Sequence, residues 1–331
     1  MNFLFFLLFT LKQINSLLFL LLQHKFDNIK VKQERDHDMT ITFRFYENSS
    51  DLDLQYSFWN QMTKNLPFAW KPTLSPKLYE SQVDFNKKSR VFAFENERLI
   101  GYMSFSGKGD FVSLGYPWVL PEFEGSVQDE LFGKVLDFAK SDEYGGKVFA
   151  QRFRSQWNKQ IDYFLSKGFQ ITNRSQIIGA KYPILLKSIQ PIPDFSFEIK
   201  DNFLFEEWKN IKTKQQPLTN EQLSMLSEYY GSIEFDYALE CKIADEPIAY
   251  FGVTIRADTD YSEILAVALD QKAVPYFYDL LTLVHNENIK RKVKTVTMAK
   301  SHLPKGIILE KLGFAALTED VMMYLRKEQQ P

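Results

Sequence analysis

KVFAQRF at residues 147–153 opens a stretch that closes with FLSKGF at residues 164–169. The same arrangement returns later in the chain, where KVKTVTM at residues 292–298 leads to LEKLGF at residues 309–314. The two stretches align without a gap. A period of about 145 residues is too long for a solenoid repeat and fits a duplicated domain. The sequence therefore predicts two copies of one domain.

A shorter match extends the repeat towards the N-terminus, because ERLIGY at residues 97–102 parallels DEPIAY at residues 245–250. Between the copies, Pro183 and Pro193 lie near the two ends of a segment with the character of a linker. We therefore expect an apolar leader over residues 1–38, an N-terminal domain over residues 39–183, a linker over residues 184–194 and a C-terminal domain over residues 195–331.

Both copies have the same order of expected elements. A short strand leads into two amphipathic helices, and a hairpin follows around a polar turn at residues 95–97 or 244–246. An apolar strand comes next, at residues 112–120 or 264–269, and the helix after it repeats apolar residues at helical spacing between Leu131 and Ala139. A strand, a second helix and a closing pair of strands complete the unit. This order predicts an α/β fold of the α+β kind, with antiparallel hairpins and one β-α-β crossover in a mixed sheet.

The charge balance and the scarcity of metal-binding residues exclude several classes of function. Forty basic and 42 acidic residues leave a net charge of −2, without the basic excess of a nucleic-acid-binding protein. Cys241 is the only cysteine, so the chain forms no internal disulfide and no cysteine-cluster zinc site. Only His285 and His302 lie within the expected domains, which excludes a His-rich metal centre. We expect no metal and no nucleic-acid partner.

The leader at residues 1–38 has three interpretations. Residues 1–22 are very apolar, but polar residues between Lys12 and Ser16 interrupt them, and the uninterrupted runs are shorter than the roughly 18–20 residues of a spanning helix. A signal peptide fits poorly, because no basic segment precedes the apolar run and no cleavage-site pattern follows it. We favour a misassigned start codon, with translation from Met39 and a cytoplasmic protein, and keep a membrane anchor in residues 1–22 as the alternative.

The element order and the helix endings resemble the GCN5-related N-acetyltransferase (GNAT) superfamily. The segments at residues 164–169 and 309–314 look like the end of the family's fourth helix, and VLPEF at residues 119–123 looks like the end of its central strand. The resemblance covers both copies, over residues 40–327. It implies that two adjacent strands splay apart and admit the thioester of an acyl-CoA. It also implies that the pyrophosphate binds free amides at the N-terminus of the following helix.

The resemblance places the expected acyl-CoA site in the first copy. The residues implied are Val119, Leu120, Phe123, Gly125, Ser126 and Val127. Gly125 would let the backbone approach a phosphate closely, but Glu122 and Glu124 would repel it, and no register supplies both of the family's glycines. The corresponding residues 270–275 of the second copy contain no glycine, and Pro275 removes an amide donor. We therefore expect one copy to be degenerate and the first to bind the donor.

Two residues are candidates for acid–base catalysis. Glu263 lies in a strand that resembles the central strand of the histone-acetyltransferase branch, where a strand glutamate is the general base. The alternative for Glu263 is a solvated residue at a strand end. Tyr163 is next to the position of the family's tyrosine acid, which falls on Phe164 and in the second copy on Leu309, and the alternative for Tyr163 is packing. His302 is expected to be a loop residue rather than a base.

These observations favour an acyltransferase over other classes. The resemblance implies an N-acetyltransferase that moves an acetyl group from acetyl-CoA, its co-substrate, to a primary amine of a small molecule or a peptide. Two alternatives remain open. One is a non-catalytic pair that binds acyl-CoA or a protein partner, because both loops depart from the family's pattern. The other, implied by the resemblance, is transfer of an aminoacyl or fatty-acyl group, because other duplicated members of the superfamily use such donors. The identity of the acceptor stays open, because fold does not fix function.

Overall fold

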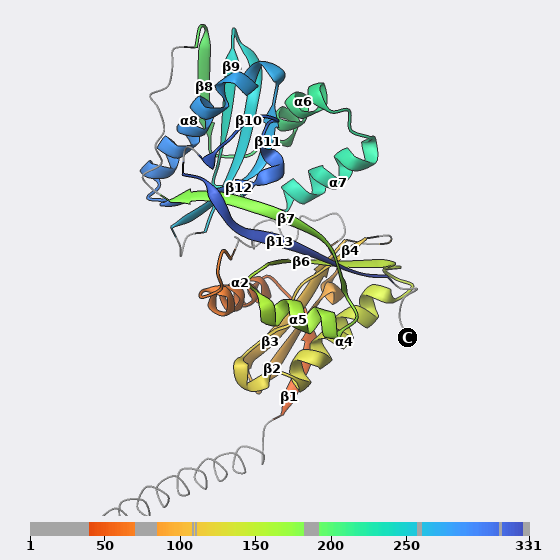
Figure 1. Ribbon diagram of the computed structural model, residues 1–331. Helices are drawn as coiled ribbons and strands as arrows, with labels where there is room; N and C mark the ends of the chain where they lie inside the picture. The colour runs from red at the N-terminus through yellow and green to blue at the C-terminus, as the bar shows by residue number, and fades with distance from the viewer. Residues whose placement is uncertain are drawn as a thin grey trace, which may run out of the picture.

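The chain is described here from a computed structural model, which has two lobes connected by long strands (Figure 1). The structure describes residues 40–69, 85–107, 109, 111–181, 192–256, 260–310 and 313–326. The apolar leader and most of the expected linker therefore lie outside the described residues. Within the described part of the chain, we find no helix long and apolar enough to cross a membrane.

The first copy extends from β1 to β7. Its elements are β1 (Ile41–Phe45), α2 (Ser50–Thr63), β2 (Arg90–Glu95), β3 (Arg98–Ser106), β4 (Val112–Leu114), β5 (Trp118–Val119), α4 (Ser126–Lys140), β6 (Val148–Arg154), α5 (Asn158–Ser166) and β7 (Gln170–Lys181). The helical spacing predicted after the apolar strand is confirmed by α4. Leu131, Val135 and Ala139 of this helix are fully buried.

The second copy has a similar order of elements from β8 to β13. Its elements are β8 (Phe195–Lys200), α6 (Phe205–Gln215), α7 (Asn220–Gly231), β9 (Tyr237–Ile243), β10 (Glu246–Ile255), β11 (Tyr261–Leu269), α8 (Phe277–Lys290), β12 (Thr295–Ala299) and β13 (Ala315–Arg326). A 3₁₀ helix, Gln271–Tyr276, connects β11 to α8. A single 3₁₀ turn, Lys300–His302, follows β12, and residues 300–310 contain no α-helix. The second helix predicted for this copy is therefore missing from those residues.

Both predicted hairpins are present. β2 and β3 turn at Asn96, whose φ is 54°, and β9 and β10 turn at Ala244 and Asp245, with φ of 48° and 62°. Positive φ values match the right-handed twist of the paired strands in two-residue hairpins, and Asn and Asp tolerate this region better than most residues.

The apolar strand predicted at residues 112–120 is divided into two parts. β4 ends at Leu114, the chain leaves the sheet at residues 115–117, and β5 rejoins β3 at Trp118. The Gly115 amide donates to the Ser104 carbonyl at 2.6 Å, and a Cβ at residue 115 would lie 2.8 Å from that same oxygen. The close backbone approach at Gly115 therefore accounts for the interruption.

The closing strands of the two copies are exchanged. β6 pairs with β13 of the second copy, β12 pairs with β7 of the first, and β7 and β13 pair with each other. A single sheet results, in the order β1-β2-β3-β4-β6-β13-β7-β12-β11-β10-β9-β8, with β5 attached to β3. The prediction of a closing pair within each copy is wrong, because in the described residues each copy contributes one strand and the pair forms between copies. The division of the chain at residues 183 and 195 stays a prediction.

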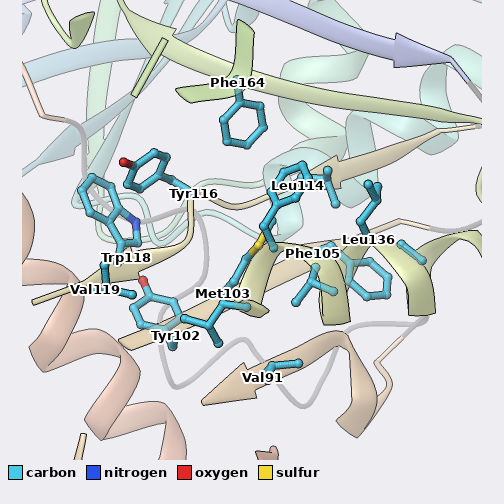
Figure 2. Packing of buried hydrophobic residues seen from close by; sticks show 14 of the residues in the cluster. Val91, Tyr102, Met103, Phe105, Leu114, Tyr116, Trp118, Val119, Leu136 and Phe164 are labelled. Atoms are coloured by element: carbon cyan, nitrogen blue, oxygen red, sulfur yellow. The ribbon is translucent and has the colours of Figure 1, made fainter. Parts of the chain in front are cut away.

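The core of the first copy is rich in aromatic side chains. Figure 2 shows Tyr102, Met103 and Phe105 of β3 in the same cluster as Tyr116 and Phe164, and all five are at most 5% exposed. Burial of one such side chain contributes about 1.5–3 kcal/mol. Two further clusters lie around the second copy, one beneath α8 and one beneath α6 and α7, and β7 of the first copy contributes Ile178 and Ala180 to the former.

Candidate functional site

In the second copy, two adjacent parallel strands part in the middle of the sheet. The ladder between β11 and β12 ends with the pair Ile264 and Met298, whereas β11 continues to Leu269 along β10. The β10–β11 ladder skips Leu265, so a bulge lies directly after the last pair. We call this opening, between residues 265–269 and residues 299–302, the second slot. Backbone groups on a strand edge inside a sheet need a hydrogen-bonding partner, which makes the second slot a candidate ligand site.

The first copy has a corresponding opening. β4 and β6 pair only up to Ser113 and Ala150, after which residues 115–119 and residues 151–154 follow different neighbours. We call the space between these two segments the first slot. Its position matches that of the second slot, because both follow the parallel pairing of the crossover strands.

Aromatic side chains connect the two sides of the first slot. The rings of Tyr116 and Phe153 are 6.1 Å apart and those of Trp118 and Trp157 are 6.3 Å apart. All four residues are at most 5% exposed. The Trp157 indole also donates a 2.8 Å hydrogen bond to the Pro67 carbonyl. These contacts hold the walls of the first slot together. The second slot instead has aliphatic and small side chains along β11, from Leu265 to Leu269.

The loop after the first slot contains the residues expected to bind acyl-CoA. Val119, Leu120 and Val127 are buried, whereas Gly125 and Ser126 are exposed. Gly125 is the N-cap of α4, with φ 89° and ψ −102°, and the helix has no side-chain cap there. Free amides at such a helix end favour an anion.

The acidic residues of this loop have cationic partners. Glu122 pairs with Arg98 at 3.1 Å, and Glu124 pairs with Lys159 of α5. Phe123 is half-buried against the aromatic cluster of the first copy. The repulsion expected between these carboxylates and a pyrophosphate is therefore partly offset.

The loop of the second copy is arranged differently. Asp270 accepts a hydrogen bond from the Lys272 amide, and Ala273 is fully buried. Lys272 lies at the surface and pairs with Glu246. The N-cap of α8, Tyr276, provides no side-chain cap. The loop that leads to the N-terminus of α8 therefore carries the positive charge of Lys272.

Glu263 is buried and holds an ion pair with the other copy. Its Oε2 accepts a 2.8 Å hydrogen bond from Arg154 Nη2 and a 3.3 Å hydrogen bond from the Tyr261 hydroxyl. Arg154 is itself fully buried, and it also donates to Asp320 Oδ1 at 2.7 Å and to the Phe68 carbonyl at 3.0 Å. The expected alternative of a solvated glutamate does not fit a side chain that is 7% exposed.

These residues belong to a polar group between the two copies, which we call the junction cluster. Its members are Arg152, Arg154, Tyr261, Glu263, His302 and Asp320. Burial acts to lower the pKa of Arg154, but Glu263, Tyr261 and Asp320 more than offset it and hold the guanidinium charged. Three strands, β13, β7 and β12, separate β6 from β11 in the sheet order, so the contact between Arg154 and Glu263 requires the sheet to curve.

Strand alternation shows which faces meet at the junction cluster. Ile264 belongs to the core beneath α8, so Glu263 faces the opposite side of β11, where α6 packs. Phe153 packs against α5, so Arg152 and Arg154 face away from α5. The junction cluster is therefore built from one sheet face of each copy.

Tyr163 lies on the other face of the first copy. Its hydroxyl donates to Asp129 Oδ1 at 3.0 Å, and Lys167 lies over its ring at 5.1 Å. Burial, together with Asp129, raises the pKa of Tyr163 above its ordinary value of 10.0. The structure therefore does not bring Tyr163 and Glu263 together, because α5 and the junction cluster are on opposite sides of β6.

Sequence reasoning identified Glu263 but missed Arg154, Tyr261 and Asp320. One signal was present, because Arg152 and Arg154 interrupt the apolar strand β6 on one face. Their partners were not visible, because Arg154 and Asp320 are 166 residues apart in the chain. Within the described residues, no group of three or more histidine, cysteine or carboxylate side chains could hold a metal ion.

Two splayed strand pairs, each followed by a loop and a helix in a mixed sheet, define the GNAT fold, and this chain has that fold in two tandem copies. A tandem GNAT protein from the clavulanic acid biosynthesis pathway superposes with a TM-score of 0.62 at 11% identity, over 87% of this chain and 98% of that one. A GCN5-related N-acetyltransferase from Sphaerobacter thermophilus gives 0.54 at 11% identity, over 86% and 95%. A GNAT-family acetyltransferase from Colwellia psychrerythraea gives 0.51 at 12% identity, over 86% and 100%. No family profile and no curated protein sequence matches the chain.

Proposed function

We propose that this protein is an N-acyltransferase that moves an acyl group, with acetyl-CoA as donor, to a primary amine of a small molecule or a peptide. The tandem GNAT fold supports acyl transfer from an acyl-CoA. The observation that carries the proposal is the second slot. There an open strand edge begins two residues after Glu263, a buried carboxylate of the junction cluster.

The second slot fits the requirements of the reaction. A pantetheine arm carries amides that can pair with an open strand edge as another strand would. The thioester would then lie near the last ladder pair, Ile264 and Met298. The reaction also needs a base that accepts the proton of the amine, and the Glu263 carboxylate on β11 would assist that step.

A competing proposal places the donor site in the first copy, at Val119, Leu120, Phe123, Gly125, Ser126 and Val127. The uncapped N-terminus of α4 supports it, and the aromatic contacts across the first slot oppose it. A bulky residue at Gly125 would be an unclear test, because φ of 89° strains any side chain there. Charge reversal beside each loop tests the same point without that strain.

Lys272→Glu and Lys159→Glu make a matched pair for this test. The two side chains are 60% and 61% exposed, and each pairs with a glutamate. Lys272 is in the loop before α8, whereas Lys159 pairs with the loop before α4. If the pyrophosphate binds before α8, Lys272→Glu should weaken acetyl-CoA binding roughly tenfold and Lys159→Glu should leave it unchanged. Titration calorimetry measures both, and the reverse pattern would place the donor in the first copy.

A non-catalytic acyl-CoA-binding or partner-binding protein is the second candidate. The packed first slot and the absence of glycine from residues 270–275 favour it. Release of free thiol from acetyl-CoA, measured with a panel of primary amines, separates the two functions. Acyl transfer predicts thiol release that depends on the amine, whereas binding without such release supports the second candidate.

A further inference from the structure

His302 lies at the point where the second slot opens. It ends the 3₁₀ turn that follows β12, four residues after Met298 of the last ladder pair. Its imidazole contacts the carbonyl of Ile264, the partner of Met298. The side chain therefore crosses from the β12 side of the opening to the β11 side.

Among the residues that the structure describes, one ring nitrogen of His302 has no hydrogen-bonding partner. This nitrogen, Nδ1, is buried. Buried polar atoms in proteins are nearly always paired, so an unpaired imidazole nitrogen calls for a ligand or a function. The imidazole contacts the Ile264 carbonyl, and in a neutral imidazole one nitrogen donates a hydrogen bond while the other carries a lone pair.

The charged groups around His302 come from several elements. The charges that act on His302 are those of Glu263 on β11 and Lys212 on α6. Tyr261 hydrogen-bonds to Glu263 from the same strand. Burial lowers the pKa of His302 below its ordinary value of 6.5; Lys212 acts in the same direction, and the Glu263 carboxylate and the Ile264 carbonyl oppose them. Arg154 and Asp320 follow behind Glu263. Burial therefore favours the neutral imidazole, and the Glu263 carboxylate acts against this effect.

Resting on the function proposed above, we infer that His302 is the base that takes the proton of the acceptor amine in the second slot. Glu263 is then a positioning residue, because its Oε2 already accepts from Arg154 and Tyr261. Its charge stabilises the imidazolium that forms when Nδ1 accepts a proton. In this arrangement His302 accepts the proton and Glu263 supplies the negative charge, whereas a lone glutamate base would do both.

The proton balance of the reaction is complete with these groups. An alkylammonium gives one proton to Nδ1, and the free amine attacks the thioester carbonyl. The nitrogen loses a second proton as the C–S bond breaks, and the departing thiolate takes up one proton to become the CoA thiol. The remaining proton passes from His302 to solvent. The products are an amide, free CoA and one proton for each ammonium consumed.

His302→Gln tests this assignment, because a glutamine amide can still donate to the Ile264 carbonyl but cannot accept a proton. His285→Gln is the matched control, since His285 is the other histidine of the second copy and lies buried on α8. We expect kcat/KM for the amine to fall by about 10²–10⁴-fold in His302→Gln, with an unchanged melting temperature. The wild-type profile should fall at acidic pH, where His302 is protonated, and the variant should lack this limb.

An NMR titration with acetyl-CoA gives a second measurement that needs no amine. The imidazole signals of His302, identified by their loss in His302→Gln, should shift when acetyl-CoA binds, and those of His285 should not. Binding that leaves His302 unperturbed, or a variant that keeps the acidic limb and loses less than threefold in rate, would overturn the assignment of His302 alone. A protein that neither binds acetyl-CoA nor releases its thiol would overturn the proposed function and this inference with it.

Discussion

Replacement of Arg154 by methionine tests how strongly the junction cluster couples the two copies. Methionine has similar length and no charge, so it removes the guanidinium without leaving a large cavity. Four groups lose a partner: the carboxylates of Glu263 and Asp320, the Tyr261 hydroxyl and the Phe68 carbonyl.

The size of the effect follows from burial. Arg154, Glu263 and Asp320 have side chains that are 1%, 7% and 12% exposed. Removing one partner of a buried ion pair costs about 3–5 kcal/mol, because the other charge remains buried without compensation. Arg152 stays within 3.5 Å of Asp320 and offsets part of that charge. We therefore expect the free energy of unfolding to fall by about 3–5 kcal/mol in Arg154→Met.

Urea denaturation, followed by intrinsic fluorescence, measures this free energy. Arg174→Met is the control, because Arg174 pairs with Glu319 at 3.2 Å between the neighbouring strands β7 and β13, with both side chains more than a third exposed. A surface pair of this kind contributes about 0–1 kcal/mol. The double variant Arg154→Met/Glu263→Gln should be less destabilised than the sum of the single changes, because it removes both charges. If Arg154→Met lowers the free energy of unfolding no more than Arg174→Met does, the junction cluster does not couple the two copies.

Two further outcomes follow from other residues. Tyr163→Phe should reduce acyl transfer by less than about tenfold in steady-state kinetics, because the Tyr163 hydroxyl binds Asp129 on the face away from the junction cluster; a loss near a thousandfold would contradict this. Asp51 has a pKa below its ordinary value of 3.8, since burial, which acts to raise it, is outweighed by the hydrogen bond from Arg44. The ionised Asp51 carboxylate therefore contributes fully to the free energy of unfolding above pH 3.8, and this contribution is lost as the pH falls through the lowered pKa. Between about pH 5 and pH 2, denaturation curves of Asp51→Asn should show a smaller loss of stability than those of the wild type.

Local sequence signals were sufficient to predict the hairpins and the helix after the first apolar strand. The polar turns at residues 95–97 and 244–246 encode hairpins, and the spacing from Leu131 to Ala139 encodes α4. Such features depend on residues close together in the chain. Their repetition in the same order made the GNAT resemblance specific, although the motifs differ from the family's at both loops.

The strand exchange could not be predicted in the same way. β7 and β13 follow similar segments, and each could pair with the crossover strand of either copy, because alternation of side chains does not encode which partner a strand chooses. The choice is decided by contacts over long separations, such as that between Arg154 and Asp320. The partners of Glu263 were missed for the same reason.

The exchange also gives the duplication a physical consequence. Glu263 is on a strand of the second copy, but the guanidinium that compensates its charge comes from β6 of the first copy. Asp320 reaches the same guanidinium because β13 has crossed to pair with β6. A lone second copy would keep the open edge of β11 but would leave Glu263 buried without Arg154, a state that costs several kcal/mol. The two copies therefore form one unit at the junction cluster, whichever slot binds the donor.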